Sequence, residues 1–210
     1  MTKYDRKNPF LSEIKEEYCI SENAGKETNH YIFDIERSGL RYKPGDSLGV
    51  FPENDSELVT LTMEKFGFYG NEDVEIKGVG KIELRDALKR ELTIHRASRK
   101  FFAAVVDKLF EGEEKNRLKT ILEDRDKLEK YLNIRDCVDI MNEYPDASFE
   151  AQEFVDTLQN ITPRLYSISS SSKAHRDEVH ATVAVVRYEN FERKRSGLAT
   201  GHLADRVEVQ

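Results

Sequence analysis

The residues best suited to chemistry lie in one run, residues 161–170, which reads ITPRLYSISS. Arg164 carries a planar guanidinium that can make paired hydrogen bonds to a phosphate. Tyr166 has a ring that can stack on a flat ligand, and Ser167 is a small hydrogen-bond donor and acceptor. On a strand, Arg164 and Tyr166 share one face and Ser167 points to the other. These groups could hold a flat anionic cofactor, but the run taken alone also fits a half-exposed edge strand.

A second candidate group lies near the end of the sequence, where a glycine-containing turn is predicted to lead into a short helix. Its residues are Gly197, Leu198, Ala199 and Thr200. Such a turn exposes backbone N–H groups and the positive end of the helix dipole, so it can hold an anion. The hydroxyl of Thr200 could add a further contact. An ordinary capped helix explains the same residues, so both interpretations stay open here.

The composition argues against several classes of function. Of the 210 residues, 35% are charged and the formal net charge is −7, so a general nucleic-acid-binding surface is not expected. No apolar run approaches the ~18 residues of a membrane span, and the N-terminus has no signal-peptide pattern. We therefore expect a cytoplasmic protein with neither nucleic acid nor membrane as a partner.

The spacing of the cysteines and histidines does not indicate a metal site, and the residues around Ser167 do not indicate a hydrolase. Cys19 and Cys137 are far apart, which fits neither a disulfide framework nor a zinc site. The five histidines show no ligand spacing, and we predict no metal site. Ser167 lacks the Gly-x-Ser-x-Gly turn around a hydrolase nucleophile.

Strands are predicted toward both ends of the sequence, where apolar residues alternate or β-branched residues run together. They cover residues 11–21, 30–36, 47–51, 164–169 and 179–188, and residues 206–209 begin another. In the second of these, Tyr31, Phe33 and Ile35 share one face. Pro44 and Gly45 predict a type II turn before the third.

The middle of the sequence changes to the three-to-four spacing of amphipathic helices. The helical patterns cover residues 54–67, 82–92, 97–110, 118–132 and 148–159. Asn54, Asp55 or Ser56 can cap the first helix and Gly67 can end it. We predict that this middle block is all helix.

The order of strand block, helical block and strand block predicts an α+β fold, in which helices interrupt an antiparallel sheet or barrel. The predicted boundaries are residues 1–53 and 161–210 for the two parts of the β domain and residues 54–160 for the helical insertion.

Several motifs together resemble one known family. Residues 162–167, TPRLYS, are similar to the flavin-binding signature of the ferredoxin–NADP reductase superfamily, in particular its diflavin branch and the sulfite reductase (NADPH) flavoprotein subunit. The likeness extends over nearly the whole sequence. It also includes residues 41–50 (RYKPGDSLGV), 91–93 (ELT), 180–188 (HATVAVVRY), 197–200 (GLAT) and 203–207 (LADRV).

The resemblance implies an antiparallel Greek-key β-barrel that binds FAD, with a helical connecting-domain insertion. Arg164 would pair with the FAD pyrophosphate, Tyr166 would stack on the isoalloxazine, and Ser167 would act catalytically beside the ring nitrogen that accepts hydride. The other implied cofactor-binding residues are Leu165 within the signature, Thr182, Val183 and Ala184 through their backbone, Tyr188 by packing, residues 197–200 at the phosphate, and Thr93 from the helical block.

The resemblance also implies an activity and partners. NADPH would give hydride to FAD, and electrons would pass to FMN or to the haem and iron–sulfur protein of sulfite reductase. The relatives carry an FMN domain upstream and an NADPH-binding domain downstream. Neither domain nor the last barrel strand falls within these 210 residues. We therefore expect part of a longer protein, with weak or partial FAD binding and little NADPH oxidation.

Two other interpretations remain open at this point. The chain could be a non-enzymatic interaction module that keeps only the barrel shape, or a fragment of a flavin or ferredoxin reductase. The trio Arg164, Tyr166 and Ser167 favours a flavin-binding protein over the interaction module, because a pure scaffold has no physical need for these side chains.

Overall fold

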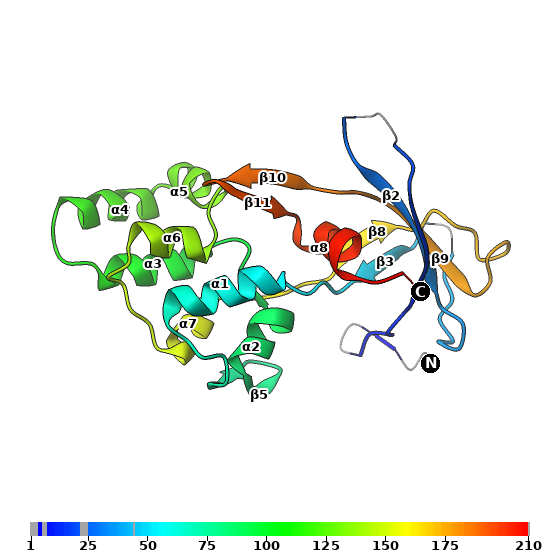
Figure 1. Cartoon of the computed structure of the whole chain (residues 1–210), viewed down its shortest axis with the longest axis horizontal. Helices are drawn as coiled ribbons and strands as arrows, with labels where there is room; N and C mark the ends of the chain where they lie inside the picture. Colours follow the sequence, from blue (N-terminus) through cyan, green and yellow to red (C-terminus); the bar gives the residue numbers. More distant parts are fainter. Residues whose placement is uncertain (1–3, 6–7, 22–24, 44, 210) are drawn as a thin grey trace. The chain divides into compact units, whose positions relative to one another are not determined.

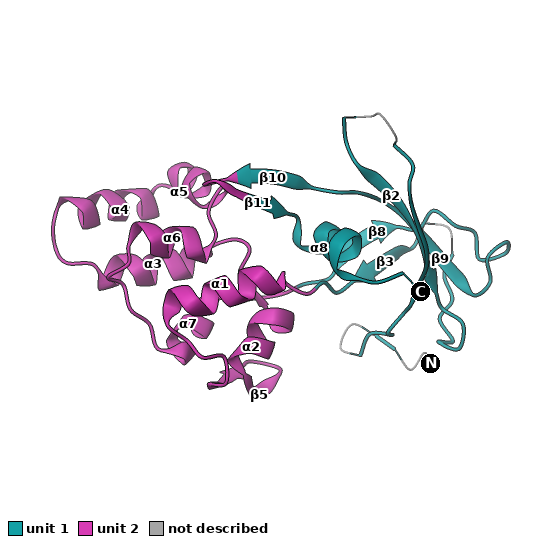
Figure 2. Cartoon of the chain, in the orientation of Figure 1, with its two compact units in different colours: residues 1–52, 162–189, 194–210 teal, residues 53–161, 190–193 magenta. Residues whose placement is uncertain are grey.

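The computed structural model describes residues 4–5, 8–21, 25–43 and 45–209, which form two compact units (Figure 2). Unit 1 comprises residues 1–52, 162–189 and 194–210, and unit 2 comprises residues 53–161 and 190–193. The fold is α+β, and the paired strands of each sheet are antiparallel (Figure 1). None of the described helices is both long and apolar enough to cross a membrane.

The larger sheet of unit 1 contains β1 (Ile14–Cys19), β2 (Thr28–Asp34) and β9 (Glu178–Ala184), in the order β1-β2-β9. Tyr31 and Phe33 of β2 are buried, and so is Ile35 just after it, which confirms the predicted face. These side chains belong to two small hydrophobic clusters that form the core of the unit. Burial of alternate residues on one face holds the register of β2.

A second sheet pairs β3 (Ser47–Val50) with β8 (Arg164–Ser167). Gly45 has a φ of 94°, which a turn of the predicted kind needs; Pro44 lies outside the described residues. β8 leads to an isolated bridge between Ile168 and Ala181, which joins this sheet to β9.

The predicted strand over residues 179–188 is wrong in its extent. β9 ends at Ala184, and β10 (Arg187–Asn190) starts a new hairpin with β11 (Arg193–Ser196). The break occurs because Val186 bonds to Gly197 and Thr200 instead of β2. A short helix α8 (Leu198–Gly201) and a π-helical turn η2 (His202–Arg206) follow.

Residues 206–209 do not form the predicted strand. Within the described part of the chain, only Val209 pairs there, through an isolated parallel bridge to Ile14.

Unit 2 is mostly helical. Its core includes a group of phenylalanine rings, among which Phe66 and Phe154 have centroids 4.1 Å apart. The helices of unit 2 are α1 (Ser56–Phe66), α2 (Leu84–Asp86), the π-helical turn η1 (Ala87–Glu91), α3 (Arg99–Lys108), α4 (Glu113–Glu123), α5 (Arg125–Leu132), α6 (Cys137–Glu143) and α7 (Ala151–Thr157).

The prediction that the middle block is all helix is wrong. β4 (Asp73–Ile76) and β5 (Gly80–Glu83) form a hairpin, and β6 (Leu92–Thr93) pairs with β7 (Gln159–Asn160). In β4, Val74 and Ile76 are buried on one face. The hairpin is short, so its two-residue alternation is easily lost between longer helical patterns.

The helix ends follow local capping chemistry. Asp55 caps α1 through its side chain, and Gly67 ends it with a φ of 73°, as predicted. The helix predicted over residues 118–132 is in fact two helices. Asp124 divides them, because its side chain accepts hydrogen bonds from the backbone of Asp126 and Lys127 and so starts α5.

A buried ion pair holds the tip of the β10–β11 hairpin within unit 2. Arg193 Nη2 lies 2.7 Å from each carboxylate oxygen of Asp136 and 2.6 Å from Asp139 Oδ1. Both carboxylates are almost fully buried at the start of α6. Burial and the neighbouring Asp139 raise the pKa of Asp136, and the hydrogen bond from Arg193 opposes that rise.

We expect Arg193→Ala to lower the free energy of unfolding by about 3–5 kcal/mol, because it removes a guanidinium that bonds to two buried carboxylates. Arg187→Ala is the matched control, since Arg187 also pairs with two carboxylates, Glu27 and Asp205, but is half exposed. Its loss should change stability by about 0–1 kcal/mol. Urea unfolding measures both, and equal losses would contradict the argument.

Candidate functional site

The predicted signature lies on β8, where its side chains alternate between two faces. The register places Tyr166 opposite Leu48 and Arg164 opposite Val50. Tyr166 is half buried and packs against the hydrophobic cluster that contains Tyr31 and Phe33. Burial raises the pKa of the Tyr166 phenol, and the charge of Arg164 partly offsets this. The phenol is therefore neutral at ordinary pH.

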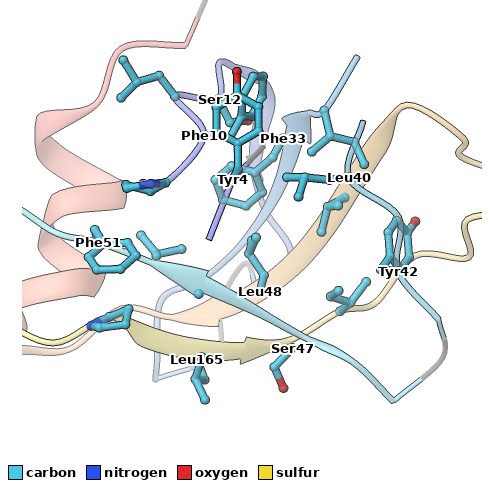
Figure 3. A pocket seen from close by; sticks show the side chains of 18 of the residues that line it. Tyr4, Phe10, Ser12, Phe33, Leu40, Tyr42, Ser47, Leu48, Phe51 and Leu165 are labelled. Carbon is cyan, nitrogen blue, oxygen red and sulfur yellow. The ribbon is translucent and has the colours of Figure 1, made fainter. Parts of the chain in front are cut away.

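Arg164 is exposed, and its guanidinium makes no hydrogen bond or ion pair with the described part of the chain. Leu165 and Ser167 are also exposed. Figure 3 shows Leu165 and Ser47 on the side of the β3–β8 ladder opposite Leu48. Arg164 thus offers a guanidinium with all its donors available to an anion.

The predicted residues Thr182, Val183 and Ala184 end β9. Ser169 N donates to His180 O, whereas Val185 N donates to Glu27 O in the direction of β2. Because backbone groups alternate along an antiparallel strand, those of Thr182 and Ala184 face the edge away from β2. The backbone of Val183 faces β2, and its side chain is buried.

The turn at residues 197–200 is held by hydrogen bonds to Val186 and within the turn itself. Gly197 N donates to Val186 O, and Thr200 Oγ accepts from Val186 N at 3.2 Å and lies 3.4 Å from Gly197 O. Ala199 is buried and Leu198 is half buried. Since the Thr200 hydroxyl already serves this turn, the backbone N–H groups at the helix start are the better donors for a ligand.

Two further predicted residues lie apart from these segments in the sequence. Tyr188 is on β10 of unit 1 and is 38% exposed. Thr93 is on β6 of unit 2, where it pairs with Gln159 and is half buried. Unit 1 therefore brings together β8, the end of β9 and the turn at 197–200, and Thr93 belongs to the other unit.

Unit 1 also contains a cavity of about 820 Å³ that the sequence did not indicate (Figure 3). Tyr4 and Phe10 line it from the N-terminal segment, with Phe33, Leu48 and Leu203 from the core. Of the predicted site residues that the structure describes, only Leu165 lines the cavity. The cavity lining therefore includes neither Arg164 nor the residues that end β9.

Comparisons with known proteins agree with the signature on β8. The family model described as "FAD binding domain" matches residues 2–202. The chain belongs to this FAD-binding domain family. The comparison confirms the family predicted from the motifs.

Several relatives carry the name sulfite reductase [NADPH] flavoprotein alpha-component. Those of Mannheimia succiniciproducens and Bacillus subtilis are each 35% identical, over 206 and 208 residues. That of Photorhabdus laumondii is 36% identical over 208 residues. The matches cover 98–99% of this chain and 34% of each relative, so the chain spans about a third of their length.

The residues present fit the chemistry of FAD. The pyrophosphate of FAD needs cationic and N–H donors, which Arg164 and the start of α8 offer. The isoalloxazine needs a flat apolar face, which the neutral ring of Tyr166 offers. At Gly197, a Cβ would lie 2.7 Å from Thr200 Oγ and 3.2 Å from Val186 Cβ, so a larger residue would disturb this turn.

Sequence reasoning missed the close packing at Gly201. A Cβ at this position would collide with the Ser196 side chain, whose Cβ would be 2.7 Å away. The signal available was a glycine inside a predicted helix, which is unfavourable unless packing requires it. Gly201 therefore allows α8 to pack directly on the end of β11.

We expect Gly201→Ala to lower the free energy of unfolding by about 1–2 kcal/mol. Overpacking costs about 1–3 kcal/mol, and the better helix propensity of alanine returns up to about 1 kcal/mol. Gly25→Ala is the control, because a Cβ there meets nothing within 4 Å. The double variant Ser196→Gly with Gly201→Ala removes the colliding side chain. If urea unfolding shows that the double variant has no higher free energy of unfolding than Gly201→Ala, the packing argument is wrong.

Proposed function

We propose that unit 1 is the FAD-binding domain, and unit 2 the connecting insertion, of an NADPH-dependent flavoprotein reductase of the sulfite reductase type. The observation that carries this proposal is the arrangement on β8, where Arg164 is exposed, has no ion-pair partner among the described residues, and lies two residues before the half-buried Tyr166. Membership of the FAD-binding domain family and the printed names of the relatives support it.

The three signature side chains have separate roles in this proposal. Arg164 binds the pyrophosphate, because its charge has no carboxylate to neutralise it within the described residues. Tyr166 stacks on the isoalloxazine, with its ring orientation held by the core behind it. Ser167 donates a hydrogen bond to the ring nitrogen that accepts hydride, and its exposed hydroxyl is accessible for that contact.

The flanking segments complete the site. Among the described residues, the segment after β8 pairs with β9 only through the bridge between Ile168 and Ala181. The backbone groups of Thr182 and Ala184 are therefore available at the edge of β9. The buried side chain of Val183 supports the site by packing in the hydrophobic core on one face of β9. The turn at residues 197–200 binds phosphate through its backbone, and Tyr188 packs on the cofactor.

We infer that the sheets of unit 1 belong to an antiparallel Greek-key barrel. The order β1-β2-β9, the bridge from β9 to the segment after β8, and the β8–β3 pairing connect five strands in one series. Such a series is what a barrel requires before it closes.

The activity of the whole protein is a further part of the proposal. When bound, FAD would supply the redox chemistry by accepting hydride from NADPH and passing electrons to FMN or to a haem and iron–sulfur protein. The domains for NADPH and FMN would be the partners of this chain. The residues of this chain position the cofactor and set its electrostatic surroundings.

The first test is the affinity for FAD of the parent chain and of Arg164→Ala, measured by equilibrium dialysis. Loss of charge-assisted hydrogen bonds worth about 1.5–3 kcal/mol should weaken binding by about 10- to 100-fold. Arg164→Lys should keep part of the affinity for FAD that Arg164→Ala loses, because lysine keeps the charge but not the planar guanidinium. Arg176→Ala, an exposed arginine of the same unit, should leave the affinity unchanged. A parent chain that takes up no FAD would favour an interaction module instead.

The second test separates stacking from charge. Tyr166→Phe keeps the ring and should retain FAD affinity within about threefold, whereas Tyr166→Leu should lose about 0.5–1.5 kcal/mol of ring–ring contact, up to about tenfold. Bound flavin fluorescence should rise in the leucine variant, since the tyrosine no longer quenches it. Unchanged fluorescence and affinity in Tyr166→Leu would show that the isoalloxazine lies elsewhere.

A further inference from the structure

Three potential metal ligands converge on the surface of unit 1, outside the flavin site. They are His175 in the loop before β9 and Glu178 and His180 on β9 itself. Glu178 Oε2 lies 3.2 Å from His175 Nδ1 and 3.3 Å from His180 Nε2. One ligand atom from each of the three residues lies within 4.8 Å of the others. Two imidazole nitrogens and one carboxylate oxygen form a common donor set for Zn²⁺.

The spacing of these atoms suits a tetrahedral ion. With metal–ligand bonds of about 2.0–2.1 Å, neighbouring ligands of tetrahedral Zn²⁺ are about 3.4 Å apart. The two distances from Glu178 Oε2 are close to this value. The His180 side chain is 11% exposed and well fixed, whereas that of His175 is 43% exposed and can turn to complete the site.

Neighbouring groups orient the ligands in the way that metal sites require. His180 Nδ1 lies 3.3 Å from His30 Nε2, and His30 Nδ1 lies 3.2 Å from Thr182 Oγ. If His180 donates from Nδ1 to His30, and His30 donates to Thr182, then His180 Nε2 keeps its lone pair for a metal. On the carboxylate, Lys15 binds Oε1 of Glu178 at 2.9 Å, and so Oε2 faces the two histidines.

The backbone around the cluster is also ordered by its own contacts. Tyr42 OH lies 2.7 Å from Ser170 Oγ, and Ser170 Oγ accepts from His180 N at 3.0 Å. His175 N donates to Ser171 O. The loop is therefore already folded back on β9, which brings His175 within reach of Glu178 without a metal.

We propose that His175, Glu178 and His180 bind a divalent transition-metal ion of the zinc type, with water in the fourth position. The ion would fasten the loop of residues 169–177 to β9, just before Thr182 and Ala184. Its role in this position is structural, because it links a loop to a strand. The proposal does not depend on FAD binding.

The test is Zn²⁺ titration by isothermal calorimetry of the tag-free chain, without FAD and after removal of bound metal with a chelator. We expect one Zn²⁺ per chain. His175→Ala should abolish the binding, and because His175 is exposed its loss should not disturb the fold. His30→Gln, which removes the imidazole that bonds to His180 but leaves the three proposed ligands in place, should weaken binding by about tenfold. His202→Gln is the control, since it is a histidine of the same unit outside the cluster.

Two additional measurements distinguish binding from a folding defect. Co²⁺ in place of Zn²⁺ should give the visible absorption of a tetrahedral site in the parent chain and not in Glu178→Gln or His180→Gln. Zn²⁺ should also raise the thermal unfolding midpoint of the parent and of His202→Gln, but not that of His175→Ala. Absence of saturable Zn²⁺ binding, or binding that His175→Ala leaves intact, would overturn the proposal.

Discussion

The antiparallel pairing of β3 with β8 is the constraint on which the rest of unit 1 depends. Ser47 pairs with Ser167, although the whole helical insertion lies between them in the sequence. The entropy cost of closing such a loop grows only with the logarithm of its length, so a long folded insertion is tolerated. Within unit 2, β6 pairs with β7 at the C-terminal end of the insertion, and Asn54 near its N-terminal end donates from its side chain to Leu92 O of β6. The signature on β8 is thus anchored on one side by β3 and on the other by the bridge to β9.

Charge is distributed differently in the two units. The carboxylates of Asp136 and Asp139 are buried and satisfied by Arg193, whereas Arg164 is exposed and has no such neighbour among the described residues. A buried pair is expensive to break but adds little net stability, so its main effect is to fix geometry. An exposed arginine without a carboxylate contributes little to folding and is instead suited to an anionic ligand. The same residue type therefore serves structure in one unit and is exposed to solvent, as a ligand-binding residue needs to be, in the other.

The sequence predicted those features that local chemistry determines. Tyr31, Phe33 and Ile35 defined the buried face of β2, Asp55 and Gly67 defined the ends of α1, and the motif at 164–167 indicated the family. The β4–β5 hairpin was missed because its strands have four residues each, too few for alternation to stand out beside helical patterns. The extent of β9 depended on contacts of Val186 with Gly197 and Thr200, which no local pattern reveals.

The histidine cluster shows another limit of sequence spacing. The expectation of no metal site was based on the spacing of the histidines alone, whereas Glu178 and His180 are two apart on a strand and so share a face. His175 joins them only because the preceding loop folds back, held by Ser170 and Tyr42. The roles assigned to Arg164, Tyr166 and Ser167 remain predictions, because side-chain positions alone do not show what they bind.

The tip of the β10–β11 hairpin has a consequence for how this protein can be divided. Residues 190–193 belong to unit 2, although they follow it in the sequence by almost thirty residues. A peptide cut at residues 53 and 161 would retain the two aspartates at the start of α6 and lose Arg193, which bonds to both of them. The helical unit is therefore not a self-contained cassette. To graft it onto another host, or to study it by dissection, one would have to supply the arginine from a second segment.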